Sequence, residues 1–173
     1  MKTLKEQDVV EMLRHYRHDW LNDLQLILGY AQMGKLDKIQ SKITEVMERS
    51  NQERGLDRLN IPKTMVWLYQ LNWRSETFQL HFQSFVDGQP AIMDDEALLT
   101  KIQKVFQILP SYQKEYEEYI GTLIFKKVDH TIHIHLTFDQ NWTDIEALKQ
   151  ELESLSFIEK VTTEEMLRIE WQE

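Results

Sequence analysis

The residues best suited to chemistry lie in one short run near the start of the chain, from Arg14 to Asn22. Residues three and four apart share one face of an α-helix, so a helix here would place His18 beside Arg14 and Asn22. A neutral imidazole nitrogen is a nucleophile that can accept a phosphoryl group. Arg14 and Arg17 could supply the cations that bind the incoming phosphoryl oxygens.

Two neighbours of His18 extend this interpretation. The carboxylate of Asp19 could orient the imidazole through its other nitrogen or favour one tautomer. Asn22, one helical turn later, could donate a hydrogen bond to the phosphoryl group or to a partner protein. The same spacing is also typical of an ordinary surface histidine, so the residues alone leave both interpretations open.

Two long helices are predicted to position this run. Apolar residues recur at helical spacing from about Lys5 to Met33, with Arg17 as the polar exception, and Gly34 is a suitable stop. A second stripe predicts a helix from about Leu36 to Leu59. The connection is very short, so the two helices should be antiparallel neighbours. His18 lies off the main apolar stripe, whose members are Val10, Leu13, Arg17, Trp20, Leu24, Ile27 and Ala31.

A two-helix hairpin cannot bury two apolar stripes well by itself. We therefore expect a homodimer in which two hairpins form a four-helix bundle. Packing of the hairpin against the rest of the same chain is the alternative.

The pattern changes at Asn60-Ile61-Pro62. Residues 1–60 contain ten basic and ten acidic residues, whereas residues 61–173 contain ten and nineteen, so the whole net charge of −9 lies after the break. We expect two domains, 1–60 and 61–173. In the second, periodicity predicts helices over Thr64–Trp73, Asp94–Leu109 and Thr143–Leu155, the last capped by Thr143 or Asn141, and strands over Phe78–Gln83, Gly121–Val128, Thr131–Phe138, Phe157–Thr162 and Met166–Trp171.

This order of elements predicts an α+β fold: a helical hairpin followed by an α/β sandwich with helices on one face of the sheet. The acidic net charge argues against nucleic-acid binding. No apolar run approaches the length of a membrane span and the start of the chain lacks a signal-peptide pattern, so we expect no membrane contact and a cytoplasmic location. The absence of cysteine fits a reducing compartment.

The run R-H-D-W-L-N-D-L-Q-L-I at residues 17–27 resembles the phosphorylated-histidine helix of the sporulation initiation phosphotransferase B family. The run L-N-W-R at residues 71–74 is also similar to that family, as is a helical hairpin followed by a small α/β domain. The resemblance is clear over most of residues 10–85; beyond about residue 90 it rests on architecture.

The resemblance implies a specific function. Family members dimerise through the hairpin into a four-helix bundle. They take a phosphoryl group from the aspartate of one response regulator and pass it to the aspartate of a second regulator, which controls sporulation. By matching, the phosphorylated residue here is His18, and Arg17, Asp19 and Asn22 match neighbouring motif positions. The protein would need no cofactor of its own, with Mg²⁺ expected in the partner's receiver domain.

Sensor histidine kinases share this architecture, and their second domain binds ATP. The five glycines of this chain are isolated from one another, at positions 29, 34, 55, 88 and 121, and no Gly-x-Gly occurs. Close backbone approach to phosphates usually requires glycine, and an acidic domain repels a triphosphate. We therefore expect the second domain to resemble a degenerate kinase ATPase domain that binds no ATP.

Other functions are compatible with the same residues. The chain could be a non-catalytic dimeric adaptor, or a degenerate sensor kinase that still binds ATP. A metal site could use His15, His18 and Asp19, but the second helix has no histidine to complete it. The remaining cluster, His130, His133 and His135, is predicted to lie on a polar sheet face rather than to bind metal.

Overall fold

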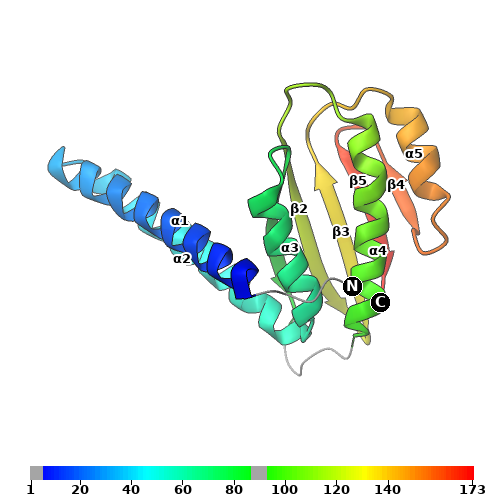
Figure 1. Cartoon of the computed structure of the whole chain (residues 1–173), viewed down its shortest axis with the longest axis horizontal. Helices are drawn as coiled ribbons and strands as arrows, with labels where there is room; N and C mark the ends of the chain where they lie inside the picture. Colours follow the sequence, from blue (N-terminus) through cyan, green and yellow to red (C-terminus); the bar gives the residue numbers. More distant parts are fainter. Residues whose placement is uncertain (1–5, 87–92) are drawn as a thin grey trace. The chain divides into compact units, whose positions relative to one another are not determined.

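A computed structural model of the chain describes residues 6–86 and 93–173. The chain divides between Asn51 and Gln52 into two compact units. The first is a pair of long helices and the second is a layered domain of helices and strands, as Figure 1 shows. The predicted α+β fold, a helical hairpin followed by an α/β sandwich, is confirmed.

The hairpin consists of α1 (Glu6–Gln32) and α2 (Leu36–Leu56), which run antiparallel to each other. The predicted first residue of the first helix, Lys5, lies outside the described residues. Gly34 ends α1 at a φ of +66°, a conformation that glycine adopts without strain. The N–H of Lys35 then bonds to the C=O of Tyr30 at 2.9 Å, which closes the helix end and turns the chain back.

The second helix crosses the boundary between the units without a break. Its last residue, Leu56, is fully buried in the core of the second unit, together with Leu59 and Ile61. The structural division at 51/52 therefore precedes the sequence-based boundary at 60/61. The charge break follows Asn60, but the apolar contacts of the second unit already begin inside α2.

The second unit contains three α-helices and five strands within its described residues. They are α3 (Pro62–Arg74), β1 (Phe78–Phe85), α4 (Asp95–Ile108), β2 (Tyr119–Val128), β3 (Thr131–Phe138), α5 (Ile145–Glu153), β4 (Lys160–Thr162) and β5 (Leu167–Gln172). Every predicted helix and strand of this unit is present, with ends shifted by a few residues. One predicted cap is wrong: Asp144, not Thr143 or Asn141, accepts the N–H of Ala147 at the start of α5.

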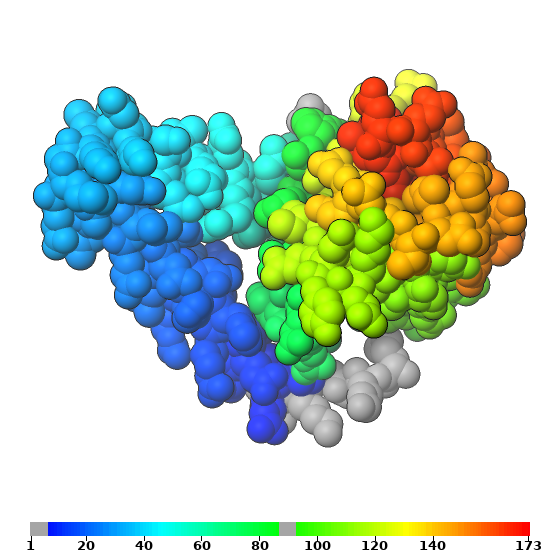
Figure 2. All heavy atoms as spheres, turned by 90° about the horizontal axis from the view of Figure 1, so that it is seen from above, coloured from blue at the N-terminus to red at the C-terminus, as the bar shows by residue number. Residues whose placement is uncertain are grey.

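The five strands form one sheet in the order β1-β2-β3-β5-β4. Strands β1 and β2 are parallel and are joined through α4, whereas the other neighbours are antiparallel. The three helices lie on one face of this sheet (Figure 1). In the space-filling view the second unit, green to red, forms one packed body (Figure 2).

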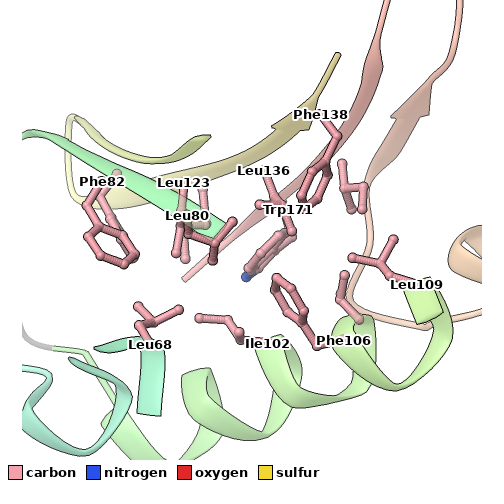
Figure 3. Close-up of a cluster of buried hydrophobic side chains, with 14 of the residues drawn as sticks. Leu68, Leu80, Phe82, Ile102, Phe106, Leu109, Leu123, Leu136, Phe138 and Trp171 are labelled. Atoms are coloured by element: carbon pink, nitrogen blue, oxygen red, sulfur yellow. The ribbon is translucent and has the colours of Figure 1, made fainter. Parts of the chain in front are cut away.

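The core lies between the sheet and its helices. On β3, Ile132, Ile134, Leu136 and Phe138 are buried and alternate with half-exposed polar residues. Figure 3 shows Ile102 and Phe106 of α4 packing under Phe138 and Trp171 of the sheet. Gly121 of β2 is essential to this packing because a Cβ there would lie 2.5 Å from the Phe138 ring. No helix among the described residues has the length and apolar character needed to cross a membrane.

Candidate functional site

His18 lies near the middle of α1, and its side chain is 70% exposed. The helix is regular through this segment, so the backbone groups of His18 are occupied and its imidazole projects from a rigid support. The structure therefore places His18 where an approaching molecule can reach the ring. That it is phosphorylated stays a prediction.

Two side chains approach the same ring nitrogen. The amide nitrogen Nδ2 of Asn22 lies 3.2 Å from Nδ1 of His18, and Oδ1 of Asp19 lies 3.5 Å from it. As placed, the Asn22 amide nitrogen can only donate, which needs a lone pair on Nδ1, whereas the Asp19 carboxylate favours a proton on the same atom. When the proton is on Nδ1, the free lone pair is on Nε2, the outer nitrogen.

The other two candidates, Arg14 and Arg17, are exposed on the same helix. Arg14 precedes His18 by four residues and Arg17 precedes it by one. The structure thus brings Asp19 and Asn22 into contact with His18 and leaves both arginines as exposed cations of α1.

The apolar stripes of the hairpin are exposed to an unusual degree. Trp20 is 44% exposed, Leu24 is 51% exposed and Leu13 is 63% exposed. Among the described residues of the hairpin, the large apolar side chains that are exposed are Val9, Val10, Leu13, Tyr16, Trp20, Leu21, Leu24, Leu26, Leu28 and Met33 of α1 and its end, with Leu36, Ile43 and Met47 of α2. So large an apolar surface on one thin unit is typical of a protein–protein interface.

One important residue of the hairpin escaped the sequence reasoning. Asp23 is buried, and it forms ion pairs with Lys42, at 3.1 Å, and with Arg49, both on α2. Burial acts to raise the pKa of Asp23, but the hydrogen bonds from Arg49 and Lys42 outweigh it, so the net pKa lies below the ordinary value. The acidic residue within an apolar pattern was a signal for a buried ion pair. Its partners, Lys42 and Arg49, lie on the other helix and could not be identified from local spacing.

The alternative metal sites find no support within residues 6–86 and 93–173, which contain no cluster of three or more metal-ligating side chains. His133 and His135 lie on the helix-free face of the sheet, as predicted. Nδ1 of His135 lies 2.9 Å from a carboxylate oxygen of Glu170 on the neighbouring strand. This pair links β3 to β5 across the sheet surface.

The helix N-termini of the second unit bear on phosphate binding. The carboxylate of Asp95 accepts the N–H groups of Lys63 and Thr64, at 2.7 and 2.9 Å, at the start of α3. Asp94 accepts two N–H groups at the start of α4 in the same way, and Asp144 accepts one at the start of α5. The N–H groups that could attract a phosphate at these helix starts already bind carboxylates of the chain itself.

The run at residues 71–74 has a structural role. The side-chain amide of Asn72 accepts the N–H of Leu80 at 2.7 Å and donates to its C=O at 2.8 Å. Leu80 lies on β1, an edge strand, so Asn72 occupies the place that a further strand would take. Ser75 and Gln52 accept the N–H groups of Phe78 and Ser84 on the same strand.

Comparisons with known proteins found similarity to the hairpin and to most of the chain. Residues 1–59 match the family model of the SpoOB-type sensor kinase alpha-helical domain. The sporulation initiation phosphotransferase B of Bacillus subtilis is 24% identical over 144 residues, which are 82% of this chain and 75% of that protein.

Two solved structures of histidine kinases are similar in a looser sense. The Acinetobacter baumannii histidine kinase AdeS is 9% identical with a TM-score of 0.40, and the alignment covers 90% of this chain and 96% of that one. The histidine kinase ThkA, solved in complex with the response regulator TrrA, is 12% identical with a TM-score of 0.43, over 94% of this chain and 60% of that one.

The family resemblance predicted from residues 17–27 is thus confirmed. The helical hairpin matches the SpoOB-type alpha-helical domain, and over most of its length the chain is similar to sporulation initiation phosphotransferase B.

Proposed function

We propose that this protein is a phosphorelay phosphotransferase that carries a phosphoryl group on Nε2 of His18, in a relay that controls sporulation. The observation that carries the proposal is the exposed imidazole of His18, whose Nδ1 is approached by Asp19 and Asn22, on a hairpin of the SpoOB type. The named relative is itself a phosphotransferase.

The proposed donor is the aspartyl phosphate of a response regulator. The Nε2 lone pair of His18 attacks the phosphorus in line, and the bond from phosphorus to the aspartate oxygen breaks, so its electron pair stays on the carboxylate. The proton remains on Nδ1, where Asp19 stabilises the positive charge of the phosphorylated ring. In the second step a carboxylate of another regulator attacks, the P–N bond breaks and its electron pair returns to Nε2.

Asp19 and Asn22 position and polarise the imidazole of His18, and no cofactor of this chain is part of the proposal. Mg²⁺ held by the partner's receiver domain would neutralise charge on the phosphoryl oxygens. The proposed partners are therefore response-regulator receiver domains, and the proposed location is the cytoplasm.

A phosphoaspartate is a better proposed donor than ATP for two reasons. The starts of α3, α4 and α5 are occupied by Asp95, Asp94 and Asp144, which would repel the phosphates of a nucleotide. The sequence contains no Gly-x-Gly, a spacing expected of a phosphate-binding loop. Both observations support transfer from another protein rather than from a nucleotide.

We also propose that the active form is a homodimer in which two hairpins build a four-helix bundle. Support comes from the exposed apolar stripes of α1 and α2, which face no core within the described residues of the first unit. Because each stripe has helical spacing, a second hairpin can cover both at once. The histidine, off this stripe, would remain accessible.

The test is phosphoryl transfer to the full chain. Receiver domains from the same genome are labelled at aspartate with acetyl [³²P]phosphate, and parallel samples receive labelled ATP. We expect acid-labile label from a receiver and none from ATP, lost in His18→Gln and kept in His130→Gln, an exposed histidine in the turn after β2. Label that survives His18→Gln would overturn the site, label from ATP would indicate a kinase, and no label from any receiver would favour an adaptor.

A further inference from the structure

Two arginines near His18 occupy different sides of α1. A helix turns by about 100° per residue, so Arg14, four residues earlier, lies about 40° from His18 around the axis and one turn away. Arg17, one residue earlier, lies about 100° away around the axis, on a different side. Nearness in the sequence is therefore misleading, because the more distant arginine shares the face of the histidine.

The side of α1 that carries Arg17 is apolar. Leu13, Trp20 and Leu24 are its neighbours at spacings of four, three and seven residues, and all three side chains are 44–63% exposed. Arg17 is the polar member of the stripe that the proposed dimer would cover. The stem of an arginine packs against apolar surface while its charged end reaches the rim, so this position fits an interface.

The direction of the side chains favours Arg14 as well. Helical side chains lean toward the N-terminus, so His18 extends over the turn that carries Arg14. Asn22 follows the same rule, since its amide reaches back to within 3.2 Å of Nδ1 of His18. Nδ1 thus faces the following turn, and the outer nitrogen is left for the side on which Arg14 is exposed.

We infer that Arg14 is the residue of this chain that binds the phosphoryl group on His18, and that Arg17 belongs to the dimer interface. The inference rests on the proposed function. It assigns different roles to two arginines that residue spacing alone had both suggested as cations for the phosphoryl oxygens. A guanidinium can donate two parallel hydrogen bonds to a phosphoryl group, which a point charge cannot. Arg14 forms and breaks no covalent bond; it lowers the energy of the charged transition state.

The experiment compares full-length variants in single-turnover transfer from a ³²P-labelled receiver domain, with the dimer measured by sedimentation equilibrium. Arg14→Gln should slow transfer about tenfold to a hundredfold, with an unchanged monomer–dimer equilibrium and helical circular dichroism. Arg14→Lys should restore part of the rate. Lys35→Gln, which removes a cation at the hairpin turn, is the matched control and should transfer at the wild-type rate.

Arg17→Gln should shift the monomer–dimer equilibrium, and its transfer rate should return toward the wild-type rate at protein concentrations that restore the dimer. The inference is overturned if Arg14→Gln transfers within about twofold of the wild type, or if Arg17→Gln remains slow as an intact dimer. These failures differ from failure of the proposed function, in which the wild type itself takes no label from any receiver and both conclusions fall together.

Discussion

The two units of this chain differ in the solvent exposure of their apolar side chains. In the second unit the apolar residues of sheet and helices are buried, with Leu68, Ile134 and Ile169 fully inaccessible. In the hairpin the apolar stripes remain about half exposed, and the one buried residue among residues 7–51 carries a carboxylate, Asp23. Both units have amphipathic helices, so the periodicity does not distinguish them.

The difference lies in what each helix can pack against. Helices α3, α4 and α5 each pack on the sheet of their own unit, whereas within the described residues of the first unit α1 has only α2 to pack against. Two helices cover too little of one another to bury two full stripes. An ion pair can fix their mutual register, and the apolar faces then remain for another surface. The hairpin thus has a buried ion pair between its helices, and many of its apolar side chains are exposed.

The largest effect should follow from a charge on the exposed stripe. Leu24→Asp removes one apolar side chain from each protomer of the proposed dimer, a loss of about 1.5–3 kcal/mol on each side, and adds two carboxylates. Sedimentation equilibrium should show a monomer at concentrations where the wild type is a dimer. Ser41→Asp, an exposed position on the other helix, should leave the dimer intact. A dimer that survives Leu24→Asp would remove this stripe from the interface.

A core truncation should act on the other unit. Phe138→Ala removes a buried ring that packs against Phe106 and Trp142, so the free energy of unfolding of this unit should fall by about 3–5 kcal/mol. Urea unfolding followed by tryptophan fluorescence measures the change, while dimer formation by the hairpin should persist. Thr137→Ala, on the open face of the same strand, should cost less than about 1 kcal/mol. Equal losses at the two positions would contradict the assignment of the core face.

A third prediction concerns the edge of the sheet. Asn72→Leu leaves the N–H and C=O of Leu80 without their side-chain partners, and we expect a loss of about 2 kcal/mol. The amide of Leu80 should also exchange hydrogen faster than in the wild type, as measured by NMR. Unchanged exchange and stability would mean that water replaces Asn72 at no cost.

Residue patterns predicted the elements well and their long-range contacts poorly. The alternation on β3 and the helical stripes of α4 follow from periodicity, which depends on the residues alone. The parallel pairing of β1 with β2 could not be predicted, because it depends on the path of the chain through α4. The structural boundary at 51/52 differs from the sequence-based boundary at 60/61 because α2 continues as a regular helix into the core of the second unit.

In the candidate site, too, local contacts could be predicted from the sequence and long-range contacts could not. The positions of His18, Asp19 and Asn22 follow from local helical spacing, and the structure brings them together. The pairing of Asp23 with Arg49 joins residues on different helices, so no local pattern could show it. The resemblance pointed to the run at residues 71–74, but the sequence could not show that Asn72 would protect a strand edge.

The effect that depends on pH concerns the ion pairs of Asp23. Because the pKa of Asp23 is lower in the folded hairpin, its stabilising contribution is present above the unfolded value of about 4 and is lost as pH falls through the folded value. Asp23→Asn should therefore lower the free energy of unfolding of the hairpin by about 1–3 kcal/mol at neutral pH. The gap from the wild type should close as pH falls below about 4.

Thermal unfolding followed by circular dichroism, from pH 7 to pH 2.5, measures that gap. Glu48→Gln, which removes an exposed carboxylate of α2, should track the wild type throughout. A gap that is constant with pH would mean that the variant is destabilised by poor packing of the introduced amide and not by loss of the charge. If Asp23→Asn lowers the stability of the hairpin but leaves the dimer intact, the two kinds of contact have separate roles. The ion pairs of Asp23 then hold α1 and α2 together, and the exposed apolar side chains determine dimer formation.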